Sequence, residues 1–264
     1  VRMGLRLEGY LSHQRSVYRP SAPPTPGSAM TSVCIDTNLF LDFYGTDEDP
    51  GEILAEIWIL REHLVFPDII FDEFLRNRSK VLDRIADGLR MREAGEPDIP
   101  ALLRENANVA ALHRTGEEYN RALWALYGDI QGMVRDPAAD PIARTFCELA
   151  RDPAVRVLHR TEDLIVRAHH RKLLGNPPKS PGRDTIGDEV VWETLLANLG
   201  EDLIFVTRDL TYRYHATYLT EEYRKRAGGA LEITDRVSDA LKLVGKPPSP
   251  ALVRFEGRDA KDAG

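Results

Sequence analysis

The sequence contains little cysteine and no long hydrophobic run. Cys34 and Cys147 are its only cysteines, too few for a disulfide framework or a cysteine-rich zinc site. No stretch approaches the roughly 18–20 uninterrupted apolar residues of a transmembrane helix. Excess basic charge is also missing, because 35 Lys and Arg residues oppose 42 Asp and Glu residues, a formal net charge of −7. These absences favour a cytoplasmic protein without a membrane segment and argue against one that coats nucleic acid non-specifically.

The two ends of the chain differ from its middle. Residues 1–29 include a run rich in proline and serine that has no hydrophobic periodicity, so we expect a disordered extension there. Residues 30–245 are predicted to form a single domain. Residues 246–264 are rich in proline and then in charge, which predicts a loose C-terminal tail.

Short apolar segments alternate with helical periodicity in the predicted domain. Strands are predicted at residues 32–36, 64–67, 202–207 and 231–233, with a further short candidate at 155–158. Helices are predicted at about residues 52–62, 71–92, 98–113, 117–133, 140–151, 161–174, 185–199, 220–227 and 236–244. The alternation predicts an α/β fold, a three-layer sandwich around a short parallel sheet. The helices at about 93–175 are interpreted as an insertion between strands 2 and 3, the third strand being 202–207.

Acidic residues follow the predicted strands. Asp36 ends the first strand, Asp209 follows the strand at 202–207, and Glu73 lies near the start of the helix after the second strand. Ligands of parallel sheets bind at the carboxyl ends of the strands, although Asp is also a common helix N-cap. Asp184 and Asp188 lie four residues apart on one helical face, where like charges repel unless a cation lies between them. The acids are therefore candidates for a metal site.

Four segments, taken in order, resemble the PIN-domain nucleases. They are Cys-Ile-Asp-Thr-Asn-Leu-Phe at 34–40, Phe-Pro leading to Glu73 at 66–73, Gly-Asp-Glu-Val-Val-Trp at 187–192 and Phe-Val-Thr-Arg-Asp at 205–209. The Asp-Thr-Asn opening and the Val-Thr-Arg-Asp ending are the most specific parts. The proline-rich stretch at 177–183 resembles a longer, largely uncharacterised PIN-like subgroup.

The resemblance implies a role for each matching residue. The acidic cluster that binds Mg²⁺ or Mn²⁺ would consist of Asp36, Glu73, Asp188 and Asp209. Asp184 is the alternative to Asp188 as the third acid, and both could contribute. Asn38 would orient the first carboxylate and Thr207 would support the last. Carboxylate oxygens suit these hard cations, which in one-metal or two-metal sites activate water for phosphodiester hydrolysis.

Three basic residues near the acids are candidates for phosphate contacts: Lys179, Arg183 and Arg208. Ordinary surface charge explains any one of them equally well. Four tyrosines are candidates for stacking on unpaired bases, against the alternative that they pack in the protein or lie singly on its surface: Tyr212, Tyr214, Tyr218 and Tyr223. The resemblance implies a metal-dependent endoribonuclease acting on single-stranded RNA. A protein partner such as an antitoxin, and a homo-oligomer, are compatible with this sequence.

Two other functions remain open at this stage. A catalytically inert PIN-like scaffold would bind RNA or protein without cutting it, but such a scaffold has no reason to keep a costly cluster of acids. A haloacid-dehalogenase-like phosphatase also begins with an Asp after its first strand. That family needs a second Asp two residues later, where this chain has Asn38, and its Thr motif precedes its Gly-Asp motif, whereas Thr207 follows Gly187 and Asp188.

Overall fold

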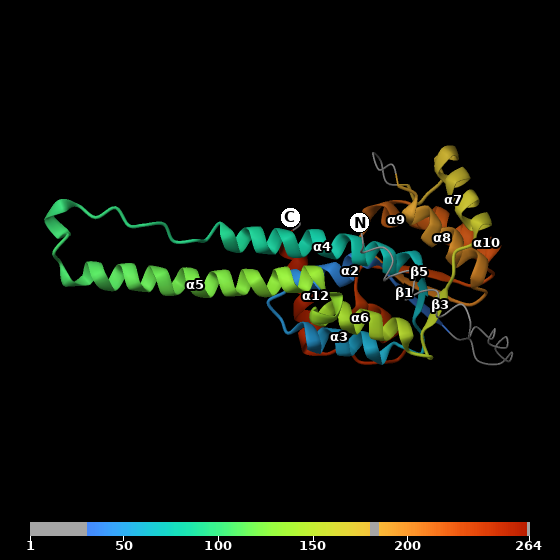
Figure 1. The fold of residues 1–264 in the computed structure, drawn as a ribbon. Helices are drawn as coiled ribbons and strands as arrows, with labels where there is room; N and C mark the ends of the chain where they lie inside the picture. Colours follow the sequence, from blue (N-terminus) through green and yellow to red (C-terminus); the bar gives the residue numbers. More distant parts are fainter. Residues whose placement is uncertain (1–30, 180–184, 263–264) are drawn as a thin grey trace.

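A computed structural model describes residues 31–179 and 185–262 of the chain (Figure 1). Its described strands are all parallel: β1 Ser32–Ile35, β2 Val65–Pro67, β3 Arg156–Leu158, β4 Leu203–Val206 and β5 Leu231–Thr234. β4 lies between β1 and β5, and β2 pairs with β3. An isolated parallel bridge between Val33 and Leu64 joins the two groups, which gives the order β3-β2-β1-β4-β5.

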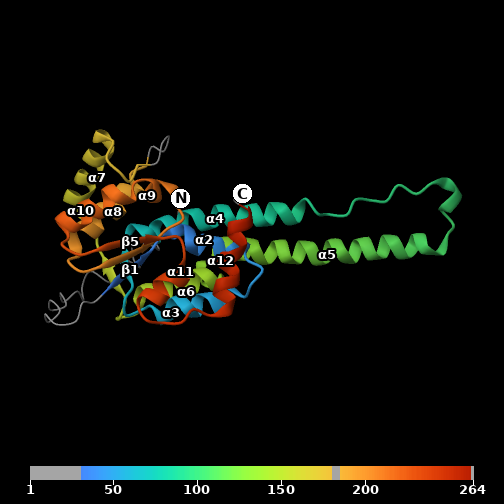
Figure 2. The same cartoon turned by 180° about the vertical axis from the view of Figure 1, so that it is seen from behind.

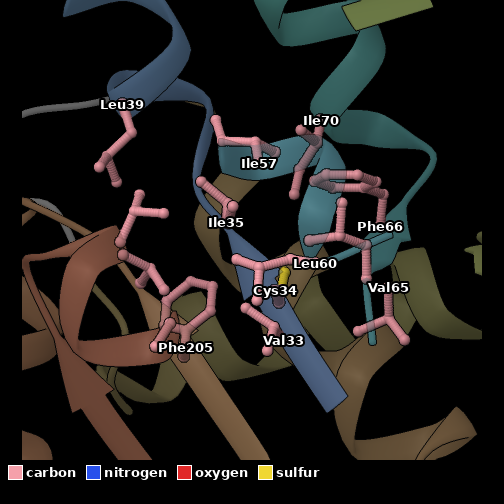
Figure 3. Close-up of a cluster of buried hydrophobic side chains, with 14 of the residues drawn as sticks. Val33, Cys34, Ile35, Leu39, Ile57, Leu60, Val65, Phe66, Ile70 and Phe205 are labelled. Atoms are coloured by element: carbon pink, nitrogen blue, oxygen red, sulfur yellow. The ribbon is translucent and has the colours of Figure 1, made fainter. Parts of the chain in front are cut away.

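The central strands form because their side chains are apolar on both faces, as expected of parallel strands covered by helices. Val33, Cys34 and Ile35 of β1 are completely buried. Figure 3 shows them between Phe66 of β2 and Phe205 of β4. Cys34 is therefore a packing residue of the core.

Helices cover both faces of the sheet. One layer contains α8 Gly187–Asn198, which packs against β2 and β3 and is backed by α7 Glu162–Leu174 and α10 Ala216–Arg226 (Figure 1). The other layer contains α3 Pro50–Ile59, α6 Pro141–Arg151, α11 Val237–Leu243 and α12 Pro250–Asp262. Short helices follow two strand ends, α2 Thr37–Asp42 after β1 and α9 Leu210–Tyr214 after β4. The predicted three-layer α/β sandwich is confirmed.

A long helical arm projects from this body. α4 Ile69–Arg90 and α5 Ala107–Arg135 run side by side, and both views show them leaving the sandwich together (Figures 1 and 2). The chain between them has only one short helical turn, η3 Ala101–Leu103. Arg78 fixes the base of the arm, since its buried guanidinium donates to Asp140 Oδ2 at 2.7 Å and to the Met133 carbonyl.

Three sequence predictions need correction. The separate helices expected at 98–113 and 117–133 are one helix, α5, because a single glycine inside a helix costs only about 1 kcal/mol relative to alanine and does not by itself end it. The insertion expected at about 93–175 lies instead between β2 and β3, because the candidate strand at 155–158 pairs with β2. The loose tail expected at 246–264 contains α12, whose Leu252 and Phe255 are buried.

Some expectations fall outside this description. The extension predicted at residues 1–29 lies outside the described residues. No helix in the described part of the chain is long and apolar enough to cross a membrane.

Candidate active site

The order of the strands reverses between β1 and β4, which makes this the switch point of the sheet. After β1 the chain forms β2 and then β3 on one side of β1, and later forms β4 and β5 on the other side. Ligands of open parallel sheets bind at such a switch point, beyond the carboxyl ends of the strands. Ile35 is paired with Val206, so Asp36 and Thr207 leave the sheet next to each other. The two most specific sequence motifs therefore meet at the position where this fold binds ligands.

Two side chains hold Asp36 in place, one from α2 and one that follows β4. Thr207 Oγ1 donates to Asp36 Oδ2 at 2.7 Å, and Asn38 Nδ2 donates to the same oxygen at 3.3 Å. The backbone N–H of Asp209 donates to Thr207 Oγ1 at 3.1 Å. Because the buried hydroxyl accepts from Asp209, its own proton is available to Asp36. Thr207 thus supports the first acid directly, whereas the sequence assigned it to the last.

Glu73 and Asp188 bring their charges to Asp36. Glu73 lies in α4 near its start, and Asp188 lies in the first turn of α8. The two helices approach closely there, since a Cβ on Gly187 would lie 3.9 Å from Glu73 Oε2. We call Asp36, Glu73 and Asp188 the acidic cluster.

The acidic cluster changes the titration of Asp36. Burial is the main cause that raises the pKa of its carboxyl group from 3.8 to about 7. The hydrogen bond from Thr207 opposes this rise, while the negative charges of Asp188 and Glu73 add to it. Asp36 therefore exchanges its proton near neutral pH, where a cation can compete with the proton for the carboxylate.

The two remaining candidate acids are Asp209 and Asp184. Asp209 is the N-cap of α9, where its Oδ1 accepts from the Thr211 N–H at 2.7 Å. Its charge acts on Tyr212, on which the charges of Asp188 and Asp36 also act. Asp184 lies outside the described residues. The first turn of α8 begins at Gly187, which gives Asp188 its place beside Glu73.

Tyr212 is a buried residue that supports the chain at Asp188. Its ring packs against Phe205 with centroids 4.7 Å apart, and its hydroxyl donates to the backbone carbonyl of Asp188 at 3.2 Å. Burial, followed by the charges of Asp188, Asp36 and Asp209, raises the pKa of its phenol well above the usual value. Of the four tyrosines, Tyr212 and Tyr223 are buried, so the alternative that they pack in the protein holds for them, whereas Tyr214 and Tyr218 are exposed.

A buried network of charges fixes α8 and the chain leading to it. Arg171 of α7 donates through Nε to Glu193 Oε1 at 2.8 Å and through Nη2 to Glu222 Oε1 at 2.5 Å. It also donates to the backbone carbonyl of Pro177. Trp192 Nε1 donates to Glu222 Oε2 at 2.8 Å, which joins α8 to α10. Because buried polar networks of this kind rigidify their surroundings, the start of α8 and hence Asp188 have a defined position.

The candidate phosphate-binding residues have different surroundings. Lys179 is exposed, close to the turn at Gly175. Arg183 lies outside the described residues. Arg208 donates to Asp42 Oδ2 at 2.8 Å, and its guanidinium lies 5.3 Å from the ring centre of Phe255. These contacts tie α12 to the site and compete with any phosphate for Arg208.

The donor set suits a hard divalent cation of the Mg²⁺ type. The acidic cluster offers carboxylate oxygens alone, and Asp36 is already oriented by hydrogen bonds. Among residues 31–179 and 185–262, no three His, Cys, Asp or Glu side chains are placed to hold an ion together. Mg²⁺ commonly takes one or two carboxylates and keeps several waters, so the cluster fits such a site rather than an all-protein cage.

Together the fold and the site define an α/β protein with an acidic cluster at the carboxyl edge of its sheet. A family model described as the PIN domain matches residues 33–212, from β1 through Tyr212. The match covers more than half of the chain, so the chain belongs to the PIN-domain family. Comparison with the curated proteins gave no match, and comparison with the solved structures gave none either.

Removing the hydroxyl of Thr207 should move the titration of Asp36 upward. Thr207→Val deletes the bond that lowers the pKa of Asp36, so we expect that pKa to rise by about one unit. The measurement is a ¹³C NMR titration of the Asp36 carboxyl carbon. Thr207→Ser keeps the hydroxyl and should titrate like the unaltered protein. An unchanged pKa in Thr207→Val would show that the hydroxyl does not stabilise the carboxylate.

Proposed function

We propose that this protein is a metal-dependent endonuclease that hydrolyses phosphodiester bonds of RNA at the acidic cluster. The observation that carries the proposal is the convergence of Glu73 and Asp188 on Asp36 at the switch point of the sheet. The negative charges of Glu73 and Asp188 act unfavourably on the carboxylate of Asp36, and a divalent cation relieves that repulsion. Membership of the PIN-domain family, whose fold is of the nuclease type, supports the same chemistry.

The residues of the site divide the work between them. Asp36, with Glu73 and Asp188, would hold Mg²⁺ or Mn²⁺, and the ion when bound would supply a Lewis acid for the scissile phosphate and its attacking water. Thr207 and Asn38 keep Asp36 Oδ2 oriented. The N-terminus of α8 lies at the site and favours the negative charge of both carboxylate and phosphate.

RNA is proposed as the substrate because the four motifs resemble nucleases of that kind. Lys179 is exposed on the chain that leads to Asp188, and with Arg183 it is the proposed contact to the phosphate backbone. The bonds of Arg208 to Asp42 make it a weaker candidate for this contact. A base is free to stack on the exposed ring of Tyr214.

The direct test is cleavage of end-labelled single-stranded RNA and of single-stranded DNA of the same sequence. We expect the purified protein to cut RNA internally with Mn²⁺ or Mg²⁺ and to stop when EDTA is added. Preferential cleavage of the DNA would support the proposed nuclease activity but contradict RNA as the substrate. Absence of cleavage with either metal would favour an inert PIN-like scaffold.

A further inference from the structure

The arm carries a row of apolar side chains on the surface of α5. Leu112, Tyr119 and Leu126 follow one another at intervals of seven residues. They are 51%, 45% and 54% exposed, although Leu and Tyr gain free energy when they are buried. We call these three residues the heptad row.

The other side of α5 already has a partner. Asn120 Nδ2 donates to the carbonyl of Ala94 at 2.8 Å, and the Ala94 N–H donates to Asn120 Oδ1 at 2.9 Å. Trp124 Nε1 donates to Glu93 Oε1 at 3.0 Å. Leu123 is buried on this side. The segment after α4 therefore covers one side of α5, and the heptad row lies beside that covered side.

The sequence of α5 has the pattern of a helix with two partners. Positions at alternating intervals of three and four residues run through four heptads: Val109, Leu112, Gly116, Tyr119, Leu123, Leu126, Ile130 and Met133. A pattern of this length is typical of a coiled coil. Half of it, at Val109, Gly116, Leu123 and Ile130, faces the covered side. Nothing lies within 4 Å of the place that a Cβ on Gly116 would take, so there is open space on the surface of α5 next to Tyr119.

We propose that the heptad row is the docking surface for a second copy of this chain, arranged antiparallel about a twofold axis at Tyr119. Leu112 and Leu126 lie seven residues on either side of Tyr119. A twofold axis there places Leu112 against Leu126 of the partner subunit, and Tyr119 against its own counterpart. An interface between two identical surfaces must be complementary to itself, and this spacing satisfies that condition.

The charges of α5 favour a second copy over a nucleic acid. Its charged residues are three arginines and three acids, Arg114, Arg121, Arg135, Glu117, Glu118 and Asp129. Because they sum to zero, two copies do not repel each other, and the helix offers no basic surface to a phosphate backbone.

The size of α5 also suits a dimer. α5 has 29 residues and is therefore about 43 Å long, so two antiparallel copies can lie side by side along the whole heptad row. Figures 1 and 2 show the arm projecting from the sandwich, which leaves room for a second arm alongside it. This inference is independent of the proposed nuclease activity.

Sedimentation equilibrium of the full chain tests the dimer. We expect a dimer, and we expect Leu112→Glu combined with Leu126→Glu to raise its dissociation constant at least about 100-fold. Ala110→Glu is the control, because Ala110 is exposed on the opposite side of the same helix. Circular dichroism should show equal helix content in all three proteins.

Cysteine cross-linking then tests the arrangement, in a background that carries Cys147→Ser. Tyr119→Cys should form a disulfide-linked dimer on oxidation. Leu112→Cys alone should not, and Leu112→Cys combined with Leu126→Cys should. Cys34 is buried and does not compete. A monomer at all concentrations, a dimer unaffected by the glutamates, or cross-linking of Leu112→Cys alone would each overturn the proposal.

Discussion

Asp36→Asn should reduce the rate of metal-dependent RNA cleavage by about 1000-fold. Asparagine has nearly the same shape and can still accept the hydrogen bond from Thr207, so the fold around it is preserved. It lacks the negative charge that a divalent cation requires, and loss of that stabilisation amounts to several kcal/mol in the transition state. The measurement is the single-turnover rate at saturating Mn²⁺.

Neighbouring acids provide the comparison for this result. Glu73→Gln and Asp188→Asn should each lower the rate at least about 100-fold, because both charges act on Asp36. Asp72→Asn is the matched control, since Asp72 precedes Glu73 in α4 but bonds to Arg160. Its rate should stay within about twofold of the unaltered protein. Equal losses at Asp72 and Glu73 would mean that the acidic cluster has no special part in cleavage.

Asp209→Asn tests whether Asp209 is a metal ligand, as the sequence pattern implies, or acts mainly as the cap of α9. Asparagine caps a helix as well as aspartate does, so α9 should keep its start. Because one oxygen of Asp209 is engaged in the cap of α9, we expect a smaller loss of activity than at Asp36.

The second large effect is a gain in stability. In the absence of metal at pH 8, Asp36→Asn should raise the free energy of unfolding by about 2–4 kcal/mol, or the melting temperature by roughly 5–10 °C. The reason is that the folded protein must ionise Asp36, with a pKa of about 7, whereas the unfolded chain ionises it near 3.8. Thermal unfolding at a series of pH values measures the difference.

The pH dependence of this gain has a fixed direction. Between pH 4 and pH 7 the unfolded chain has released the Asp36 proton and the folded protein has kept it, so the cost to the unaltered protein grows as pH rises. The advantage of Asp36→Asn should therefore be near zero at pH 4, increase up to about pH 7, and remain level above it. An advantage that does not change with pH would contradict the raised pKa.

The strands and the acids after them could be predicted from the sequence because both depend on local patterns. A parallel strand covered on both faces is a short apolar run, and the acids follow directly at its carboxyl end. That Thr207 bonds to Asp36 required the pairing of β1 with β4, which joins residues 171 positions apart. That Asp209 caps α9 likewise depends on the direction of its side chain, whose Oδ1 accepts from the Thr211 N–H.

The arm and the C-terminal helix were predicted less well, for different reasons. Gly116 suggests a break when read locally, but one interior glycine costs only about 1 kcal/mol, and contacts with α4 and between Asn120 and Ala94 hold α5 elsewhere along its length. At the C-terminus, the prolines were interpreted as a loose tail. Pro250 instead occupies the first turn of α12, where proline is tolerated, and Leu252 and Phe255 pack on the body.

The most direct measurement of the central claim is the binding of Mn²⁺, followed by electron paramagnetic resonance at pH 7 and pH 8. We expect the unaltered protein to bind Mn²⁺ more tightly at pH 8, by about twofold, because half of Asp36 is protonated at pH 7. Asp36→Asn should lose binding at both pH values, while Asp72→Asn should bind normally. Equal binding by the unaltered protein and Asp36→Asn would contradict a metal site at the acidic cluster.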